Sequence, residues 1–97
     1  MHFEIILAPD AVGALKRLDA RIRSEVRDQI ELHLRHEPAK ASKSRIKRLR
    51  GLRQPQYRLR IGEVRVFYDI VEAEVHVLAI VEKAQTYQWL DEQGAPK

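Results

Sequence analysis

The stretch YRLRIGEVRVFYDIVEAEVHVLAIV, residues 57–81, decides the fold of this chain. Apolar and other side chains alternate along it with a period of two, which is typical of β-strands whose two faces meet different surroundings. Two short breaks, Gly62-Glu63 and Glu72-Ala73, divide it into three pieces of strand length. Glycine at the first central position suits a two-residue hairpin turn. We therefore expect three consecutive antiparallel strands joined by short turns.

The two turns fix the register and so assign each side chain to one face of the sheet. Ile61 should pair with Val64, and Arg60 with Arg65. One predicted face is nearly all apolar and carries Tyr57, Leu59, Ile61, Val64, Val66, Tyr68, Ile70, Val75, Val77, Ala79 and Val81. The other is mixed and partly open, and carries Arg58, Arg60, Arg65, Phe67, Asp69, His76, Leu78 and Ile80. We expect helices to cover the apolar face.

The N-terminal half supplies those helices. Residues 2–7 are predicted to form a further strand, and Pro9 suits the first turn of a helix. Apolar residues then recur at helical spacing, with a joint at Asp19 or Ala20; they are Val12, Leu15, Leu18, Ile22, Val26, Ile30 and Leu34. This pattern predicts a helical hairpin over residues 9–36 that ends at Pro38.

The remaining segments complete a single domain spanning residues 1–97. Residues 37–53 look like a basic connector with a short turn of structure around Ile46 and Leu49. Residues 84–92 are expected to form a closing helix, and residues 94–97 a frayed tail. The predicted fold is α+β: an N-terminal strand and a helical hairpin packed on one face of a small, mainly antiparallel twisted sheet, with a short C-terminal helix.

Composition excludes several classes of site. The chain has no cysteine, so it has neither a disulfide framework nor a cysteine-based zinc site. His33 and His36 lie three residues apart but lack further ligands in the sequence, so we expect no metal and no cofactor. The apolar run 3–8 is too short for a signal peptide and is broken by Glu4. No segment approaches the about 20 apolar residues of a membrane span. We expect a cytoplasmic protein with no membrane partner.

Positive charge is concentrated in one region. The formal net charge is +4, and the only acid between residues 40 and 65 is Glu63. The basic residues of that span are Lys40, Lys43, Arg45, Lys47, Arg48, Arg50, Arg53, Arg58, Arg60 and Arg65. Such a segment attracts polyanions. A solvated basic surface and a patch for an acidic protein remain open alternatives.

The predicted register places Arg60 directly across from Arg65, with Arg58 two residues along. Facing like charges are unfavourable unless water solvates them, a carboxylate neutralises them or a phosphate bridges them. Arginine suits phosphate because its planar fork binds bidentately. The trio therefore favours a phosphate or RNA site over a solvated face, with Phe67 as a ring for base stacking. His76 beside Asp69 fits a structural pair better than a proton carrier.

Residues 47–87, KRLRGLRQPQYRLRIGEVRVFYDIVEAEVHVLAIVEKAQTY, resemble the C-terminal half of the RelE/ParE toxin superfamily. The shared features are a basic L-R-G-L lead-in, a Y-R-L-R strand, a G-x-x-R-V-x-Y hairpin and an apolar V-x-V-L-x-I strand. The resemblance covers roughly residues 3 to 90. It implies the toxin of a type II toxin–antitoxin system, with an antitoxin protein as partner. RelE-like members cleave mRNA on the ribosome by 2′-hydroxyl transesterification and use no metal.

The resemblance also implies roles for individual residues. Arg58 and Arg60 match the two basic positions of the Y-x-L-x strand, and Arg65 matches the arginine of R-V-x-Y. Lys83 stands where many members carry an arginine, and Tyr87 stands at the C-terminal tyrosine. These five are the expected catalytic residues of a metal-independent endoribonuclease. Further RNA contacts are expected from Lys43, Lys47, Arg48, Arg50, Arg53 and Phe67.

Two other functions share this fold. A ParE-like inhibitor binds DNA gyrase and cleaves nothing, and an inactive module only binds its antitoxin. The arginine trio favours the nuclease, whereas the segment Val81-Glu82-Lys83-Ala84, with one base where relatives often have two or more, favours the others. Tyr87 equally fits a role in capping the core. In every case we expect an acidic antitoxin segment over the basic face or the apolar groove beside it, in a hetero-oligomer.

Overall fold

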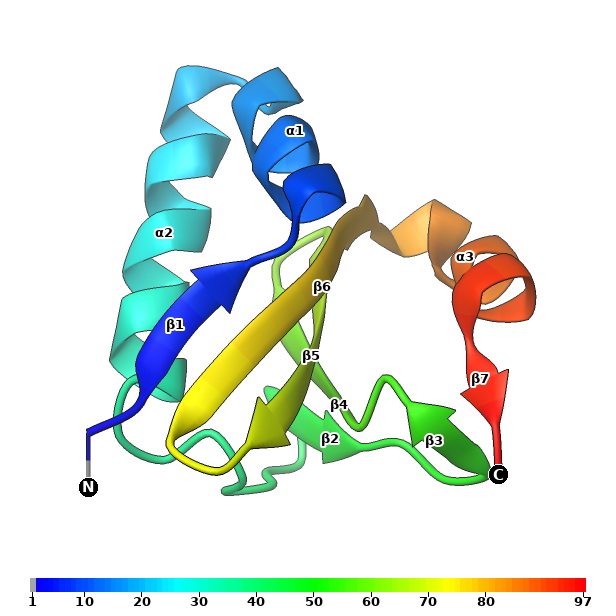
Figure 1. Cartoon of the computed structure of the whole chain (residues 1–97). Helices are drawn as coiled ribbons and strands as arrows, with labels where there is room; N and C mark the ends of the chain where they lie inside the picture. Colours follow the sequence, from blue (N-terminus) through cyan, green and yellow to red (C-terminus); the bar gives the residue numbers. More distant parts are fainter. Residues whose placement is uncertain (1) are drawn as a thin grey trace.

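The three strands predicted from residues 57–81 form the centre of the molecule (Figure 1). The structure is a computed structural model that describes residues 2–97. The elements along the chain are β1 (Glu4–Leu7), α1 (Pro9–Arg17), α2 (Ala20–Leu34), β2 (Ile46–Arg48), β3 (Leu52–Gln54), β4 (Tyr57–Ile61), β5 (Val64–Val71), β6 (Glu74–Glu82), a 3₁₀ turn (Lys83–Gln85), α3 (Thr86–Gln93) and β7 (Ala95–Pro96). This arrangement confirms the predicted α+β fold.

The main sheet has the strand order β1-β6-β5-β4-β2. β1 runs parallel to β6, and the other pairs are antiparallel. Both predicted turns are present, with the predicted pairs Ile61–Val64 and Arg60–Arg65. Gly62 has a φ of +56°, a conformation that glycine adopts without steric cost. The hairpin register that brings the two arginines together is therefore confirmed.

Beyond the middle of β6 the predicted assignment of faces is wrong. Phe67 pairs with Ala79 and Tyr68 pairs with Val77, so Leu78 is an extra residue on β6, a β-bulge. An extra residue inverts the alternation that follows it. Ile80 therefore belongs to the buried core, whereas Ala79 pairs with Phe67 and Val81 pairs with Arg65 on the opposite face.

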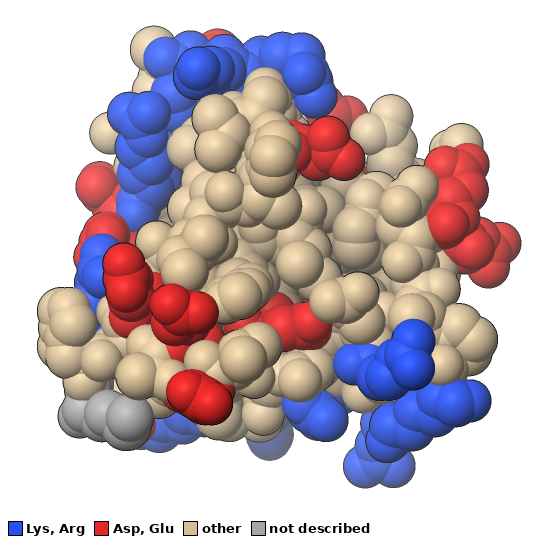
Figure 2. Space-filling view, viewed as in Figure 1, with Lys and Arg blue, Asp and Glu red and all other residues tan. Residues whose placement is uncertain are grey.

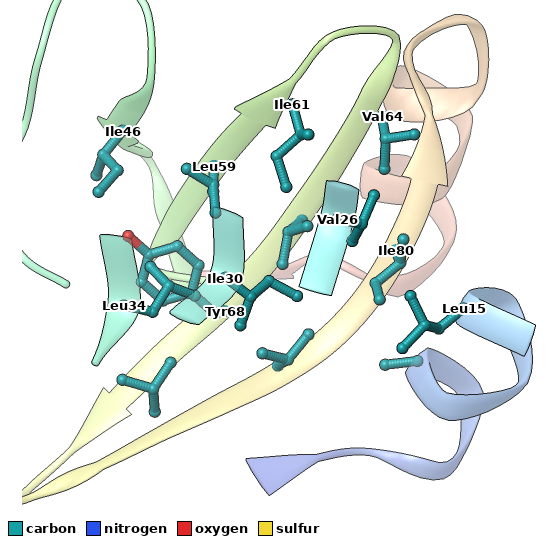
Figure 3. Packing of buried hydrophobic residues seen from close by; sticks show 14 residues of the cluster. Leu15, Val26, Ile30, Leu34, Ile46, Leu59, Ile61, Val64, Tyr68 and Ile80 are labelled. Atoms are coloured by element: carbon teal, nitrogen blue, oxygen red, sulfur yellow. The ribbon is translucent and has the colours of Figure 1, made fainter. Parts of the chain in front are cut away.

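The helical hairpin packs on the apolar face of the sheet, as predicted. The Asp19 carboxylate begins α2 by accepting hydrogen bonds from the amides of Arg21 and Ile22 at 3.1 and 3.0 Å. Figure 3 shows side chains of both helices facing those of the strands in one layer. The buried cluster comprises Ala11, Leu15, Val26, Ile30, Leu34, Ile46, Leu59, Ile61, Val64, Val66, Tyr68, Val75, Val77 and Ile80.

The opposite face of the sheet is covered at one end. α3 and β7 lie on the side of the sheet away from the helical hairpin of α1 and α2 (Figure 1). The Trp89 ring of α3 stacks on Phe67 with centroids 4.9 Å apart and an angle of 8° between the planes. Phe67 is 0% exposed. The expectation of an open Phe67 ring is therefore wrong, because Trp89 covers it.

Two connecting segments are more ordered than predicted. The basic connector contains β2, which pairs with β4, and β3. The C-terminal residues are not a frayed tail, since Ala95–Pro96 pairs with β3 in a second, two-stranded sheet. The main-chain amide of Lys97 also donates to the carbonyl of Gly51 at 3.4 Å. These contacts hold the end of the chain against the connector.

Tyr68 should contribute to stability through its hydroxyl as well as its ring. The ring is fully buried, and the hydroxyl donates to the Pro38 carbonyl at 2.6 Å. Tyr68→Phe leaves that carbonyl without its partner, so we expect a loss of about 1–2 kcal/mol in the free energy of unfolding, measured by urea denaturation. Tyr57→Phe, which removes a phenolic oxygen from the neighbouring stacked ring, is the matched control. Equal losses in both variants would contradict this role for the Tyr68 hydroxyl.

Candidate functional site

Three arginines gather on the sheet face opposite the helical hairpin of α1 and α2. Arg58 and Arg60 alternate with the core residues of β4, so their side chains project away from the core. Arg65 pairs directly with Arg60 across the β4–β5 hairpin. Among residues 2–97, no carboxylate forms an ion pair with any of the three. The trio is therefore a cluster of positive charge without an internal counter-ion.

The charges of the trio act on one another. Burial lowers the pKa of Arg58, and the neighbouring Arg65 and Arg60 lower it further. Burial and Arg60 likewise lower the pKa of Arg65, against an opposing effect of Glu63. The Nε–H of Arg58 is buried and finds no hydrogen-bond acceptor among residues 2–97. An anion at this face would relieve both the repulsion and the lost hydration.

Arg65 is held in place by main-chain carbonyls. Its Nη1 donates to the Gly62 carbonyl at 2.7 Å and to the Val64 carbonyl at 3.1 Å. The residue is only 6% exposed, whereas Arg60 is exposed. Arg60 is thus the most accessible member of the trio, and Arg65 contributes a fixed charge beneath it.

β2 extends the basic surface beyond β4. Lys47 pairs with Arg58, and paired residues of antiparallel strands project to the same face. Arg48 belongs to the other face, where its guanidinium lies 4.9 Å from the centre of the Tyr57 ring. Arg45 precedes β2, and its carbonyl accepts a hydrogen bond from the Arg60 amide at 2.8 Å. Arg45 was missed as a site residue, although the spacing of Lys47 and Arg45 in the sequence places both beside β4.

The other predicted basic contacts are spread over the surface. Lys43 lies before β2, Arg50 lies between β2 and β3, and Arg53 lies on β3; all three are exposed. In the view of Figure 2, basic side chains gather around the foot of the molecule where β3 meets the C-terminus, and acidic side chains lie over α3. Among the RNA contacts predicted in the basic connector, strand pairing places Lys47 beside Arg58 of the trio.

Tyr87 and Lys83 both follow β6, in α3 and in the 3₁₀ turn that precedes it. Tyr87 lies on α3 and is 86% exposed, so it does not cap the core. Lys83 lies beside the turn between β4 and β5, because its main-chain amide donates to the Glu63 carbonyl at 2.7 Å. The Lys83 side chain is exposed. Among residues 2–97, neither side chain forms a hydrogen bond or an ion pair with Arg58, Arg60 or Arg65.

Asp69 organises the connection into β4. It pairs with His76 in the sheet, as predicted, but its carboxylate accepts from the Gln54 side chain and the Gln56 amide, each at 2.7 Å. The Gln56 side-chain oxygen in turn accepts from the Ile70 amide at 2.9 Å. His76 is hydrogen-bonded to Glu74 instead, at 2.9 Å. Asp69 is therefore a structural residue that fixes the strand carrying Arg58 and Arg60.

These residues are suited to binding phosphate. Guanidinium groups stay charged near neutral pH and stabilise charge on phosphate oxygens. They are poor proton acceptors for the same reason, so the trio supplies binding and electrostatic stabilisation but no general base. Among residues 2–97, no group of three or more histidine, aspartate or glutamate side chains could hold a metal ion. In that same range no helix is long and apolar enough to cross a membrane.

The sequence between residues 5 and 87 matches the family described as the ParE toxin of the type II toxin–antitoxin system parDE. The chain belongs to this family. It is thus a type II toxin of the RelE/ParE superfamily, as its resemblance implied. No curated protein matches the chain.

Solved structures of toxins share the fold of this superfamily member. The RelE–RelB complex from Pyrococcus horikoshii OT3 includes a chain that matches with a TM-score of 0.71 and 22% identity, over 88% of this chain and 99% of that one. A mutant of Escherichia coli RelE in the free state matches with a TM-score of 0.69 and 18% identity, over 95% of this chain and 94% of that one. The toxin–antitoxin complex RelBE2 from Mycobacterium tuberculosis gives a TM-score of 0.66 and 22% identity, over 84% and 99%.

Asp69 should matter for the stability of the site. Asp69→Asn replaces one of two acceptor oxygens with a donor that faces the donors of Gln54 and Gln56. We expect a loss of about 2 kcal/mol in the free energy of unfolding, measured by urea denaturation. Asp91→Asn makes the same chemical change at an exposed position of α3 and should have little effect. A loss at Asp69 no larger than that at Asp91 would contradict the role assigned to this carboxylate.

Proposed function

We propose that the chain is an endoribonuclease that cleaves mRNA on the ribosome and so inhibits translation. The observation that carries the proposal is the Arg58–Arg60–Arg65 cluster, whose charge no carboxylate of residues 2–97 neutralises by an ion pair. A cluster of this kind costs free energy in the isolated protein. The RNA backbone supplies the missing negative charge at regular intervals, and arginine binds its phosphates bidentately.

The reaction would be a transesterification within the RNA. The 2′-oxygen attacks the adjacent phosphorus, the bond to the 5′-oxygen of the next nucleotide breaks, and the products are a 2′,3′-cyclic phosphate and a 5′-hydroxyl end. Arg60 would bind the phosphate oxygens from solvent, with Arg58 and Arg65 stabilising the additional charge of the transition state. The proton of the 2′-hydroxyl would pass to Tyr87 or to water, because arginine is a poor base. A water molecule would supply the proton that turns the departing 5′-oxygen into the 5′-hydroxyl.

An antitoxin protein is the proposed regulator of this site. Four of the solved structures with this fold are toxin–antitoxin complexes, from Pyrococcus horikoshii, Mycobacterium tuberculosis, Methanococcus jannaschii and Escherichia coli. An acidic segment of such a partner would neutralise the trio as RNA does. The toxin would then be inactive for as long as the antitoxin occupies the basic face.

The nuclease proposal is tested by inducing the chain in bacterial cells and mapping mRNA 5′ ends in translating ribosomes. We expect new ends in phase with codons, each bearing a 5′-hydroxyl. No codon-phased ends after induction, in cells whose growth the chain arrests, would rule the proposal out.

Arg60→Ala should reduce the rate of cleavage at least tenfold. The reason is the loss of a charge-assisted contact to phosphate, which is worth about 1.5–3 kcal/mol. Arg27→Ala removes the same side chain from the exposed surface of α2 and should cleave at the wild-type rate. The measurement is the frequency of mapped ends at equal protein levels. A wild-type rate for Arg60→Ala would remove Arg60 from the site.

Inhibition of DNA gyrase is the second candidate function. The match to a family described by the ParE toxin favours it, as does the absence of a general base among the three arginines. Gyrase inhibition predicts a loss of negative supercoiling in a reporter plasmid after induction, with no new mRNA ends. The same cultures therefore separate the two functions.

A further inference from the structure

A hollow at the edge of the sheet continues the basic surface beyond Arg60. Ser44, Arg45, Arg60 and Gly62 line this edge hollow, which has a volume of about 250 Å³. The hydrogen bond from the Arg60 amide to the Arg45 carbonyl holds its two sides together. Arg60 therefore belongs both to the trio on the sheet face and to the edge hollow.

The Arg45 side chain is positioned from α2. Its Nη1 lies 3.3 Å from the Gln29 side-chain oxygen, and the same oxygen is hydrogen-bonded to His33 Nε2 at 2.9 Å. Within residues 2–97, Arg45 has no ion pair and the Ser44 hydroxyl has no hydrogen-bond partner. The edge hollow thus offers two unneutralised cations and a hydroxyl donor in a space that accommodates a ribose-phosphate unit.

The charges on the two sides of the trio determine the direction in which a bound polyanion would extend from it. Toward β6, Arg65 faces Val81, and Val81 lines a groove with Trp89 and Glu92 of α3. Acidic side chains lie over α3 in the view of Figure 2. Toward β2, the segment 40–48 contains no acid, and Lys47 pairs with Arg58. A polyanion bound at the trio is therefore attracted toward β2 and repelled from α3.

We propose that the edge hollow is a second phosphate subsite for single-stranded RNA. Arg45 and Ser44 would bind the backbone phosphate next to the one held by the trio, with Arg60 between the two. The inference rests on the proposed function, since it names the path of the RNA that the site would cleave. Arg45 contributes to binding and takes no part in the chemistry.

The experiment measures binding of 2′-O-methyl RNA to the purified full chain. This probe lacks the attacking hydroxyl, so binding is measured without cleavage. We expect Arg45→Ala to weaken binding of an octanucleotide about tenfold, to lower the slope of log affinity against log salt by about one unit, and to leave binding of a dinucleotide unchanged. Arg60→Ala should weaken both probes, because Arg60 faces both subsites.

Two further variants sharpen the comparison. Arg45→Glu should weaken octanucleotide binding more than Arg45→Ala, and Arg27→Ala, which removes an exposed arginine from α2, should leave it unchanged. Thermal unfolding of each variant shows that the losses come from the site and not from misfolding. Wild-type affinity and salt slope for Arg45→Ala would overturn the subsite. So would an acidic peptide whose binding depends on Arg45 when octanucleotide binding does not.

The proposed subsite and the proposed nuclease activity can be refuted independently of each other. Arg45-dependent binding of the octanucleotide without codon-phased mRNA ends in cells supports the subsite and refutes the nuclease. Codon-phased ends together with binding that is independent of Arg45 refute the subsite and support the nuclease.

Discussion

The pairing of Arg60 with Arg65 is the constraint on which the rest of the site depends. The residues between them form a turn that Gly62 makes with positive φ, and the next pair, Leu59 with Val66, is fully buried. A shift of one residue would move those side chains to the opposite face. The hydrophobic core thus forces two like charges to face each other. The burial of apolar side chains on the other side of the sheet offsets the electrostatic free energy that this costs.

Main-chain carbonyl dipoles, and not carboxylates, offset the repulsion between Arg60 and Arg65. Arg65 donates to two main-chain carbonyls of its own hairpin, which hold the guanidinium without cancelling its charge. The nearby carboxylate of Asp69 is engaged by two donors from the segment before β4. Positive charge therefore persists on this face of the sheet. A preorganised charge of this kind binds an anion without paying for rearrangement of the site.

The sequence predicted the strands, both hairpin turns and the Arg60–Arg65 pair, because alternation and turn residues are local properties. It did not predict the bulge at Leu78, which places Ile80 in the core and Val81 beside Arg65. A continuous apolar run such as Val77–Val81 reads the same with or without an extra residue. The burial of Phe67 depends on Trp89, twenty-two positions later in the chain, and no local pattern contains that contact. Arg45 carries one local signal, its two-residue spacing from Lys47, but no local pattern contains its hydrogen bond with Gln29 of α2.

The bulge and the closing helix α3 together make the charge of this sheet face uneven from β6 to β2. Because the bulge moves Ala79 and Val81 to the face that carries Arg65, that face becomes apolar on β6. Trp89 packs on the same region, and α3 brings Asp91 and Glu92 with it. On the other side of β4, the connector carries Arg45 and Lys47 without a carboxylate between Lys40 and Arg48. One face of one sheet thus changes from apolar and acidic to basic across three strands. A polyanion that meets the trio is attracted more strongly toward β2 than toward α3, so the fold itself sets its orientation.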